Sequence, residues 1–124
     1  MNKLPLEKRV QILNMLVEGS SMRSIERIAG VSINTVAKLL VEAGQAAERF
    51  HDVTVRDLKT TQLQADEIWS FCVAKEGNVR KMKTVRPDAG DVWTFTALDR
   101  DSKMMVSWFV GDRTLGAATA FMKD

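Results

Sequence analysis

The stretch that decides the fold is residues 63–73, which read Leu63-Gln64-Ala65-Asp66-Glu67-Ile68-Trp69-Ser70-Phe71-Cys72-Val73. Its aromatic and branched apolar residues predict a mostly buried β-strand. Asp66 is the informative residue, because a carboxylate in a buried strand is costly unless it is paired, hydrogen-bonded or bound to a metal. Side chains alternate along a strand, so Asp66 and Glu67 point to opposite faces and only one is expected in a site. The face of Asp66 is the more polar one, which favours Asp66. An acid satisfied by a neighbouring Lys or Arg is the alternative.

Two more strands and a helix are predicted downstream. The segments 92–98 and 104–110 have strand composition, and the polar run 99–103 between them has the chemistry of a hairpin turn. Gly111 breaks the last strand, and Asp112 is predicted to cap a helix. The apolar face of that helix is expected to contain Leu115, Ala118 and Phe121 or Met122.

Upstream, residues 5–44 have the pattern of three short helices. Pro5 fits a first helical turn and Gly19 a left-handed stop, Ser20 or Ser21 can cap the second helix, and Ser32 can cap a third that ends at Gly44. The residues expected to face inward are Leu6, Val10, Leu13 and Val17 in the first helix, Ile25, Ile28 and Ala29 in the second, and Val36, Leu39 and Leu40 in the third.

Residues 21–40 match a helix-turn-helix, with a short helix, a turn at Gly30-Val31-Ser32 and a capped second helix. Residues at the start of the second helix of such a motif meet base edges, and basic residues on the first contact phosphates. The residues predicted to contact bases are Ile33, Asn34, Thr35 and Lys38, and those predicted to contact phosphates are Arg23 and Arg27. A three-helix bundle that binds protein, or nothing, is the alternative.

The composition is that of a globular protein: 45% of the 124 residues are hydrophobic and 27% are charged. No apolar run is long enough to predict a membrane span, and the N-terminus lacks the apolar stretch of a signal peptide. A single Cys72 and a single His51 argue against a zinc site and an internal disulfide. We therefore expect a cytoplasmic protein without a membrane partner.

The densest basic stretch is Lys75 to Arg86, which contains one acid, Glu76. Arg80, Lys81 and Lys83 are the candidates here for phosphate contacts beside a site. A solvated loop is the alternative, and it is the more common reason for a cluster of charge.

The sequence also resembles a known family. Asp66-Glu67-Ile68-Trp69, the segment 93–99 (Trp-Thr-Phe-Thr-Ala-Leu-Asp) and the segment 110–114 (Val-Gly-Asp-Arg-Thr) are similar, in order and spacing, to the catalytic domain of bacterial insertion-sequence-one transposases. The resemblance covers about residues 63–123, and an N-terminal helix-turn-helix is also that family's arrangement. The family's zinc-finger region is not matched. The resemblance implies a ribonuclease-H-like fold and a DDE transposase.

The chemistry implied by that resemblance uses two Mg²⁺ (or Mn²⁺) ions, held by three carboxylates, to cleave DNA and transfer strands at the element's terminal inverted repeats. Asp66 matches the first carboxylate. The second Asp and the Glu are not matched within residues 1–124, so we expect a truncated or partial transposase that binds no metal stably and is inactive as this chain. If residues 73 and 92 face each other across the intervening loop, Asp99 falls opposite Asp66 and becomes a candidate metal ligand, although a turn role for Asp99 is favoured.

These observations predict an α+β protein with three segments. Residues 1–44 form a helix-turn-helix domain, residues 45–61 a linker or short helix, and residues 62–124 a partial ribonuclease-H-like domain of three antiparallel strands and one helix. The predicted partner is double-stranded DNA, with a homo-oligomer on it. The alternative functions are a non-enzymatic DNA-binding protein, either a regulator or a truncated transposition inhibitor, and a small α+β domain whose helices bind protein.

Overall fold

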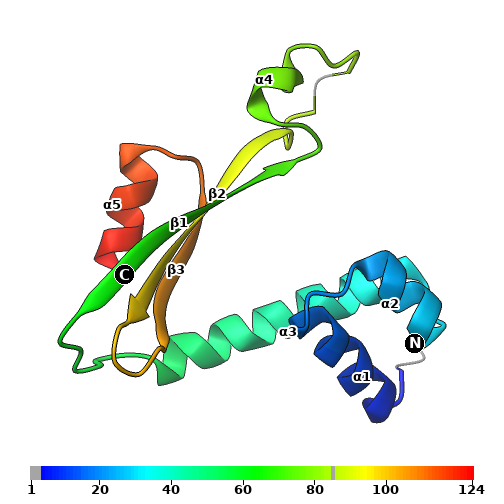
Figure 1. Cartoon of the computed structure of the whole chain (residues 1–124), viewed down its shortest axis with the longest axis horizontal. Helices are drawn as coiled ribbons and strands as arrows, with labels where there is room; N and C mark the ends of the chain where they lie inside the picture. Colours follow the sequence, from blue (N-terminus) through cyan, green and yellow to red (C-terminus); the bar gives the residue numbers. More distant parts are fainter. Residues whose placement is uncertain (1–3, 85) are drawn as a thin grey trace. The chain divides into compact units, whose positions relative to one another are not determined.

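The computed structural model describes residues 4–84 and 86–124, and within them the chain forms five helices and a three-stranded antiparallel sheet (Figure 1). The chain divides into two compact units, Met1–Arg56 and Asp57–Asp124. The helices of the first unit precede all the strands, which confirms the predicted α+β class. Among the described residues, no helix has the length and hydropathy needed to cross a membrane.

The first unit consists of α1 (Leu6–Val17), α2 (Met22–Ala29) and α3 (Ile33–Thr54). The local signals in the sequence set most of the helix ends. Gly19 and Gly30 adopt positive φ angles of 78° and 65°, which suit glycine after a helix. Ser21 and Ser32 cap α2 and α3, because each hydroxyl accepts a hydrogen bond from a backbone N–H three residues later.

The core of the first unit is built from Ile12, Ile25 and Val36, which are fully buried, with Ala29 beside them. The prediction for α2 was right for Ile25 and Ala29 and wrong for Ile28, which is exposed. The buried stripe predicted for α1 was wrong for Leu6, Val10 and Val17, while Leu13 is half-buried. The helix α1 has apolar residues on two of its sides. The side that packs on the other helices contains Ile12, Met15 and Leu16, whereas Leu6, Val10 and Val17 are exposed.

The helix α3 is longer than the sequence suggested. It was expected to end at Gly44, but it passes through this glycine and continues to Thr54, a length of 22 residues. A glycine inside a helix costs only about 1 kcal/mol, and the residues after it are good helix formers. In the third helix Val36 is buried as predicted, whereas Leu40 is exposed.

The second unit is a meander of β1 (Leu63–Cys72), β2 (Gly90–Asp99) and β3 (Met105–Gly111), with the strands in that order across the sheet. The short helix α4 (Glu76–Val79) lies between β1 and β2, and α5 (Leu115–Lys123) follows β3. The register pairs Asp66 with Thr96 and Leu63 with Asp99. The prediction that Asp66 lies opposite Asp99 was therefore wrong, because Cys72 pairs with Gly90, which shifts the register by three residues from a pairing of residues 73 and 92.

The helix α5 covers one face of the sheet, where Phe121 packs on Phe95 and Ala97. The strand β1 was expected to be mostly buried, and this was wrong, since all ten of its residues are exposed. It lies at an edge of the described sheet and has β2 as its only paired neighbour there. The buried strand is β2, which has neighbours on both sides.

The cap of α5 also differs from the prediction. Thr114, and not Asp112, caps the helix, because its hydroxyl accepts a hydrogen bond from the N–H of Ala117 at 3.2 Å. The face of α5 that lies on the sheet was predicted correctly for Ala118 and Phe121 and wrongly for Leu115. Ala117, Ala118 and Phe121 pack there, whereas Leu115 and Met122 are exposed.

Candidate functional site

The turn between α2 and α3 is held by a contact that the sequence did not reveal. A carboxylate oxygen of Glu26, in α2, accepts a hydrogen bond of 3.0 Å from the backbone N–H of Ile33, the first residue of α3. That N–H has no partner inside its helix, and the acid lies at the positive end of the helix dipole. Glu26 therefore fixes the start of α3 relative to α2, which is the relation that a helix-turn-helix needs.

Replacing Glu26 by Gln is expected to lower the free energy of unfolding of the first unit by about 1–2 kcal/mol, because the charged cap of α3 is lost. Thermal unfolding followed by helical circular dichroism measures the change. Glu48→Gln, on the exposed side of α3, is the matched control and should unfold like the wild type. Equal midpoints for the two variants would contradict a capping role for Glu26.

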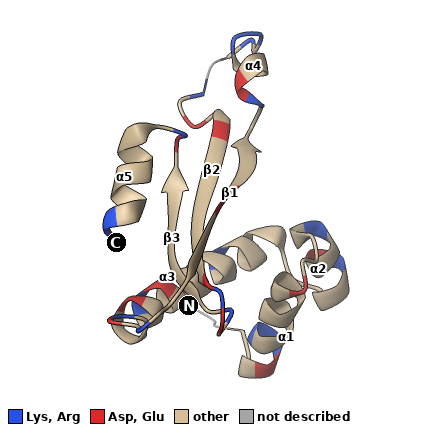
Figure 2. Cartoon of the chain, turned by 60° about the vertical axis from the view of Figure 1, so that its left-hand side comes forward, with Lys and Arg blue, Asp and Glu red and all other residues tan. Residues whose placement is uncertain are grey.

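The outward face of the first unit carries the residues predicted to meet DNA. Arg23 and Arg27 are exposed on α2, four residues apart and so on one face, and Asn34 and Lys38 are related in the same way on α3. Figure 2 shows basic positions on α2. Lys38 lies 3.9 Å from Glu42, an exposed pair that opens at little cost.

The other two predicted base-contacting residues are partly engaged in the structure. Ile33 is half-buried. The hydroxyl of Thr35 lies 2.9 Å from that of Ser32 and so belongs to the cap of α3. The polar groups most available to a ligand at the start of α3 are therefore the side chains of Asn34 and Lys38.

Asp66 lies in the middle of β1, on the exposed edge strand. Its carboxylate accepts a hydrogen bond of 2.8 Å from the N–H of Glu67, and its backbone carbonyl accepts one of 3.4 Å from the hydroxyl of Thr96. Because β1 is exposed, the argument that Asp66 is a costly buried acid does not apply. Asp66 lines an open pocket between β1 and α5, with Ala65, Glu67, Phe95, Ala118, Phe121 and Met122.

Glu67, which was predicted to point to the other face from Asp66, has a structural partner. Its carboxylate accepts a hydrogen bond of 2.9 Å from Nε of Arg113. The guanidinium of Arg113 also stacks 4.8 Å from the ring centre of Trp93. This cluster ties β1 to the segment before α5. The partner of Glu67 could not be read from the sequence, since 46 residues separate the two charges.

Asp99 has the turn role that the sequence favoured. Its carboxylate accepts hydrogen bonds from the hydroxyl and the backbone N–H of Ser102, at 2.5 and 2.8 Å. These bonds hold the pKa of Asp99 below its ordinary value. Asp66 pairs with Thr96, and Asp99 lies three residues further along β2, about 10 Å away at the usual rise per residue. The side chain of Asp99 therefore points to the face of the sheet opposite to that of Asp66.

The described acids of the second unit do not form the two-ion site implied by the resemblance. Of the acids considered, Glu67 is paired with Arg113 and Asp99 with Ser102, which leaves Asp66 alone. Within residues 4–84 and 86–124, no three His, Cys, Asp or Glu side chains are close enough to hold a metal. The described residues do not fit a two-ion site by themselves.

The basic stretch lies between β1 and β2, around α4 (Figure 2). Arg80, Lys81 and Lys83 are exposed there. Lys75 lies 5.0 Å from the ring centre of Trp69, and Arg86 forms an ion pair of 2.6 Å with Asp88 that holds the pKa of this acid below its ordinary value. Three of the five cations of the stretch are thus presented at the surface without a role in packing β1 or the loop.

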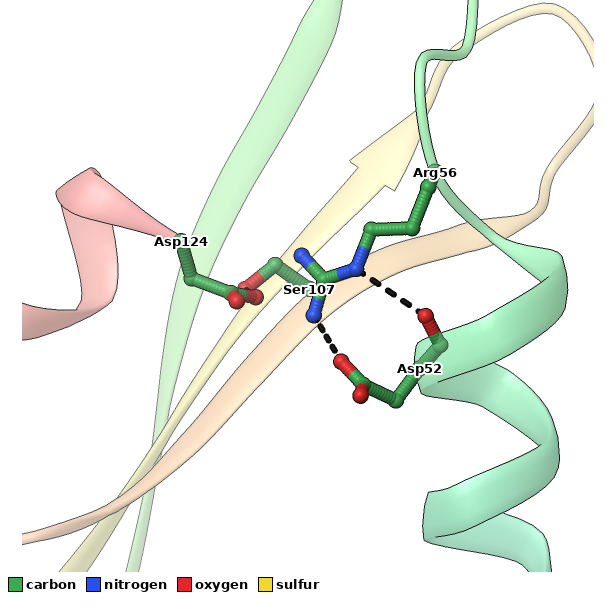
Figure 3. A network of polar contacts seen from close by, with 4 residues as sticks. All are labelled: Asp52, Arg56, Ser107 and Asp124. Atoms are coloured by element: carbon green, nitrogen blue, oxygen red, sulfur yellow. Dashed lines mark hydrogen bonds and ion pairs between the residues drawn. The ribbon is translucent and has the colours of Figure 1, made fainter.

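Two further polar contacts lie near the ends of the units (Figure 3). In the second unit, the hydroxyl of the buried Ser107 donates a hydrogen bond of 2.6 Å to the carboxylate of Asp124. In the first unit, the guanidinium of Arg56 pairs with the carboxylate and the carbonyl of Asp52, one turn earlier. The first contact helps hold the end of α5 to β3, and the second stabilises the end of α3.

No protein-family model, curated protein or solved structure matches this chain. The function proposed for it therefore depends on its own residues and on the resemblance described from its sequence.

Proposed function

We propose that the first unit is a helix-turn-helix module that binds duplex DNA. The observation that carries the proposal is the exposed pair Asn34 and Lys38 at the start of a helix whose first turn is fixed by Glu26 and Ser32. An amide and an ammonium group are side chains that hydrogen-bond to base edges or phosphates. Arg23 and Arg27 supply positive charge on the preceding helix, as phosphate contacts require.

We propose further that the whole chain is part of an insertion-sequence transposase, with the second unit as the opening part of a ribonuclease-H-like catalytic domain. The meander of three antiparallel strands followed by a helix packed on one face is compatible with such a domain. Asp66 on β1 then contributes the first catalytic carboxylate, the DNA partner is the terminal inverted repeat of the element, and Mg²⁺ or Mn²⁺ serves the complete enzyme.

A second candidate function is a DNA-binding protein without catalysis, either a regulator or an inhibitor that occupies element ends. The observation that favours it is the isolation of Asp66, whose neighbouring acids are paired with Arg113 and Ser102. This candidate shares the DNA-binding module with the first, so the two differ in what the second unit does.

The experiment that tests DNA binding is a titration of the 124-residue protein with duplex DNA at increasing salt. Two phosphate contacts, from Arg23 and Arg27, are expected to weaken affinity by about 12-fold between roughly 50 and 200 mM salt, because bound counterions are released. Arg23→Ala and Arg27→Ala should each reduce the steepness of log affinity against log salt concentration by about one, because each removes one phosphate contact. Lys123→Ala, in α5, is the control. An affinity that does not respond to salt contradicts the proposal.

Selection of bound sequences from a random duplex library separates the two candidates. Enriched sequences that match inverted repeats flanking the coding DNA support the transposase, and sequences that match a promoter support the regulator. Incubation of the same repeats with the protein and Mg²⁺ or Mn²⁺ should give no nicking, since Asp66 stands alone in the described sheet. Nicking that disappears in Asp66→Asn would overturn this expectation and establish a catalytic unit.

A further inference from the structure

The helix α3 carries a regular apolar pattern that continues into its exposed C-terminal half. The proposed DNA binding does not use this pattern. Residues Val36, Leu39, Ala43, Ala46, Phe50 and Val53 follow one another at alternating spacings of three and four, the a and d positions of a heptad repeat. We call these six residues the α3 seam. At its start the seam belongs to the core, where Val36 is fully buried. At its end Phe50 is 69% exposed and Val53 is 82% exposed.

The seam leads into an apolar groove on the same unit. The groove lies between α1 and α3 and is lined by Leu6, Arg9, Val10, Leu13, Leu39, Glu42 and Ala43. Leu6 and Val10 are two of the apolar residues of α1 that the three-helix core leaves exposed. The groove is thus continuous with the core at one end and with the uncovered part of the α3 seam at the other.

From this continuity we propose that a second copy of this chain pairs with the first through the α3 seam, with the two helices antiparallel. In this register the partner's Phe50 lies opposite Ala46, and the partner's Val53 lies opposite Ala43. Each large side chain then meets a small one, as well-packed layers require. A parallel pair would place Phe50 against Phe50 and Ala43 against Ala43, which alternates crowded layers with voids.

The antiparallel register also brings the C-terminal end of one α3 to the groove of the other copy. That helix end has a partial negative charge and carbonyls without partners inside the helix. Arg9 lines the groove, and among the described residues its buried Nε has no hydrogen-bond partner. Glu42 also lines this groove, 3.9 Å from Lys38, and Arg9 is the groove side chain whose charge suits an entering helix C-terminus. The pair of Asp52 and Arg56 keeps this helix end formed.

The proposed pairing leaves the DNA-binding face free. Asn34 and Lys38 occupy f and c positions of the same heptad, on the side of α3 away from the seam. A two-fold pair joined through the seam presents one such face on each copy, which is how helix-turn-helix dimers read two half-sites. The pairing uses residues other than those of the proposed DNA-binding face, and it is measured without DNA. Failure of one proposal can therefore be told apart from failure of the other.

The test is sedimentation equilibrium of the full chain over the micromolar to millimolar range. We expect a reversible monomer–dimer equilibrium. Val53→Asp and Phe50→Asp should each weaken it by about 100-fold, because both copies would bury a carboxylate at the seam. Val41→Asp is the matched control, since Val41 is a valine of the same helix, 57% exposed and at an f position of the heptad, on the side away from the seam. Its dimer should be as tight as that of the wild type.

Orientation is tested by disulfide cross-linking in a Cys72→Ser background. Ala43→Cys and Val53→Cys combined in one chain should cross-link two copies, whereas neither single variant should do so. Efficient cross-linking of a single variant indicates parallel helices and overturns the antiparallel register. A wild type that stays monomeric, or a Val41→Asp variant weakened as much as Val53→Asp, overturns the pairing. Helical circular dichroism confirms that each variant is folded.

Discussion

Replacing Phe121 by Ala is expected to unfold the second unit. Phe121 is buried on α5, its ring centre lies 5.7 Å from that of Phe95, and these two residues with Ala97 make up the buried apolar core there. Truncation of a buried Phe costs about 3–5 kcal/mol, and a unit with so small a core has little more stability than that to lose. The loss of this one side chain should release α5 and disorder the sheet.

The measurement uses the placement of the tryptophans. The chain has three, Trp69, Trp93 and Trp108, all in the second unit, and it has no tyrosine. Intrinsic fluorescence therefore reports this unit alone, while helical circular dichroism is dominated by the first. Phe121→Ala should red-shift the fluorescence and leave most of the helical signal. Leu115→Ala, in the same helix but 84% exposed, should change neither. A cooperative fluorescence transition in Phe121→Ala with a wild-type midpoint would contradict the packing described here.

The second large effect is expected on DNA affinity. Asn34→Ala and Lys38→Ala should each weaken binding to the selected duplex by about 1–3 kcal/mol, or roughly 5- to 150-fold, if each side chain reads a base. Where the replaced side chain reads a base, the loss of affinity should be greater for the selected duplex than for random DNA. Where it contacts a phosphate, the loss should be similar for both duplexes. Fluorescence anisotropy of labelled duplexes measures both affinities.

Two controls match these variants. Asn14→Ala removes an exposed amide from α1, and Lys59→Ala removes an exposed ammonium group outside the helices. Both should bind as the wild type does. If the protein binds well and both Asn34→Ala and Lys38→Ala keep full affinity, the start of α3 is not the recognition element.

The two parts of the proposal place different demands on the chain. The proposed DNA-binding face lies within α2 and α3, since its cap, its turn and its outward side chains all belong to residues 21–38. A two-ion catalytic site needs several carboxylates on one face of a sheet, and the described sheet offers Asp66. The unpaired outer edge of β1 in this part of the chain is available to a further strand, which is compatible with a larger ribonuclease-H-like sheet.

The sequence by itself determined the local features of this protein. Glycines at positions 19 and 30 and serines at positions 21 and 32 fixed the starts and ends of the first helices, because positive φ and N-terminal capping are properties of single residues. The hairpin between β2 and β3 followed in the same way from its turn residues, with Asp99 bonded to Ser102. The alternation of Asp66 and Glu67 followed from the geometry of any strand.

Tertiary structure decided what depends on neighbours distant in sequence. The helix α1 has two apolar sides, and either could have been buried. Ile12 is buried against Ile25 and Val36, whereas Val10 is exposed. The strand β1 is as apolar as β2, yet it is exposed because it lies at the edge of the described sheet. The partners of Glu26 and Glu67 likewise came from other elements. Burial and charge pairing are energies of assembled elements, so the residues of one element do not determine them.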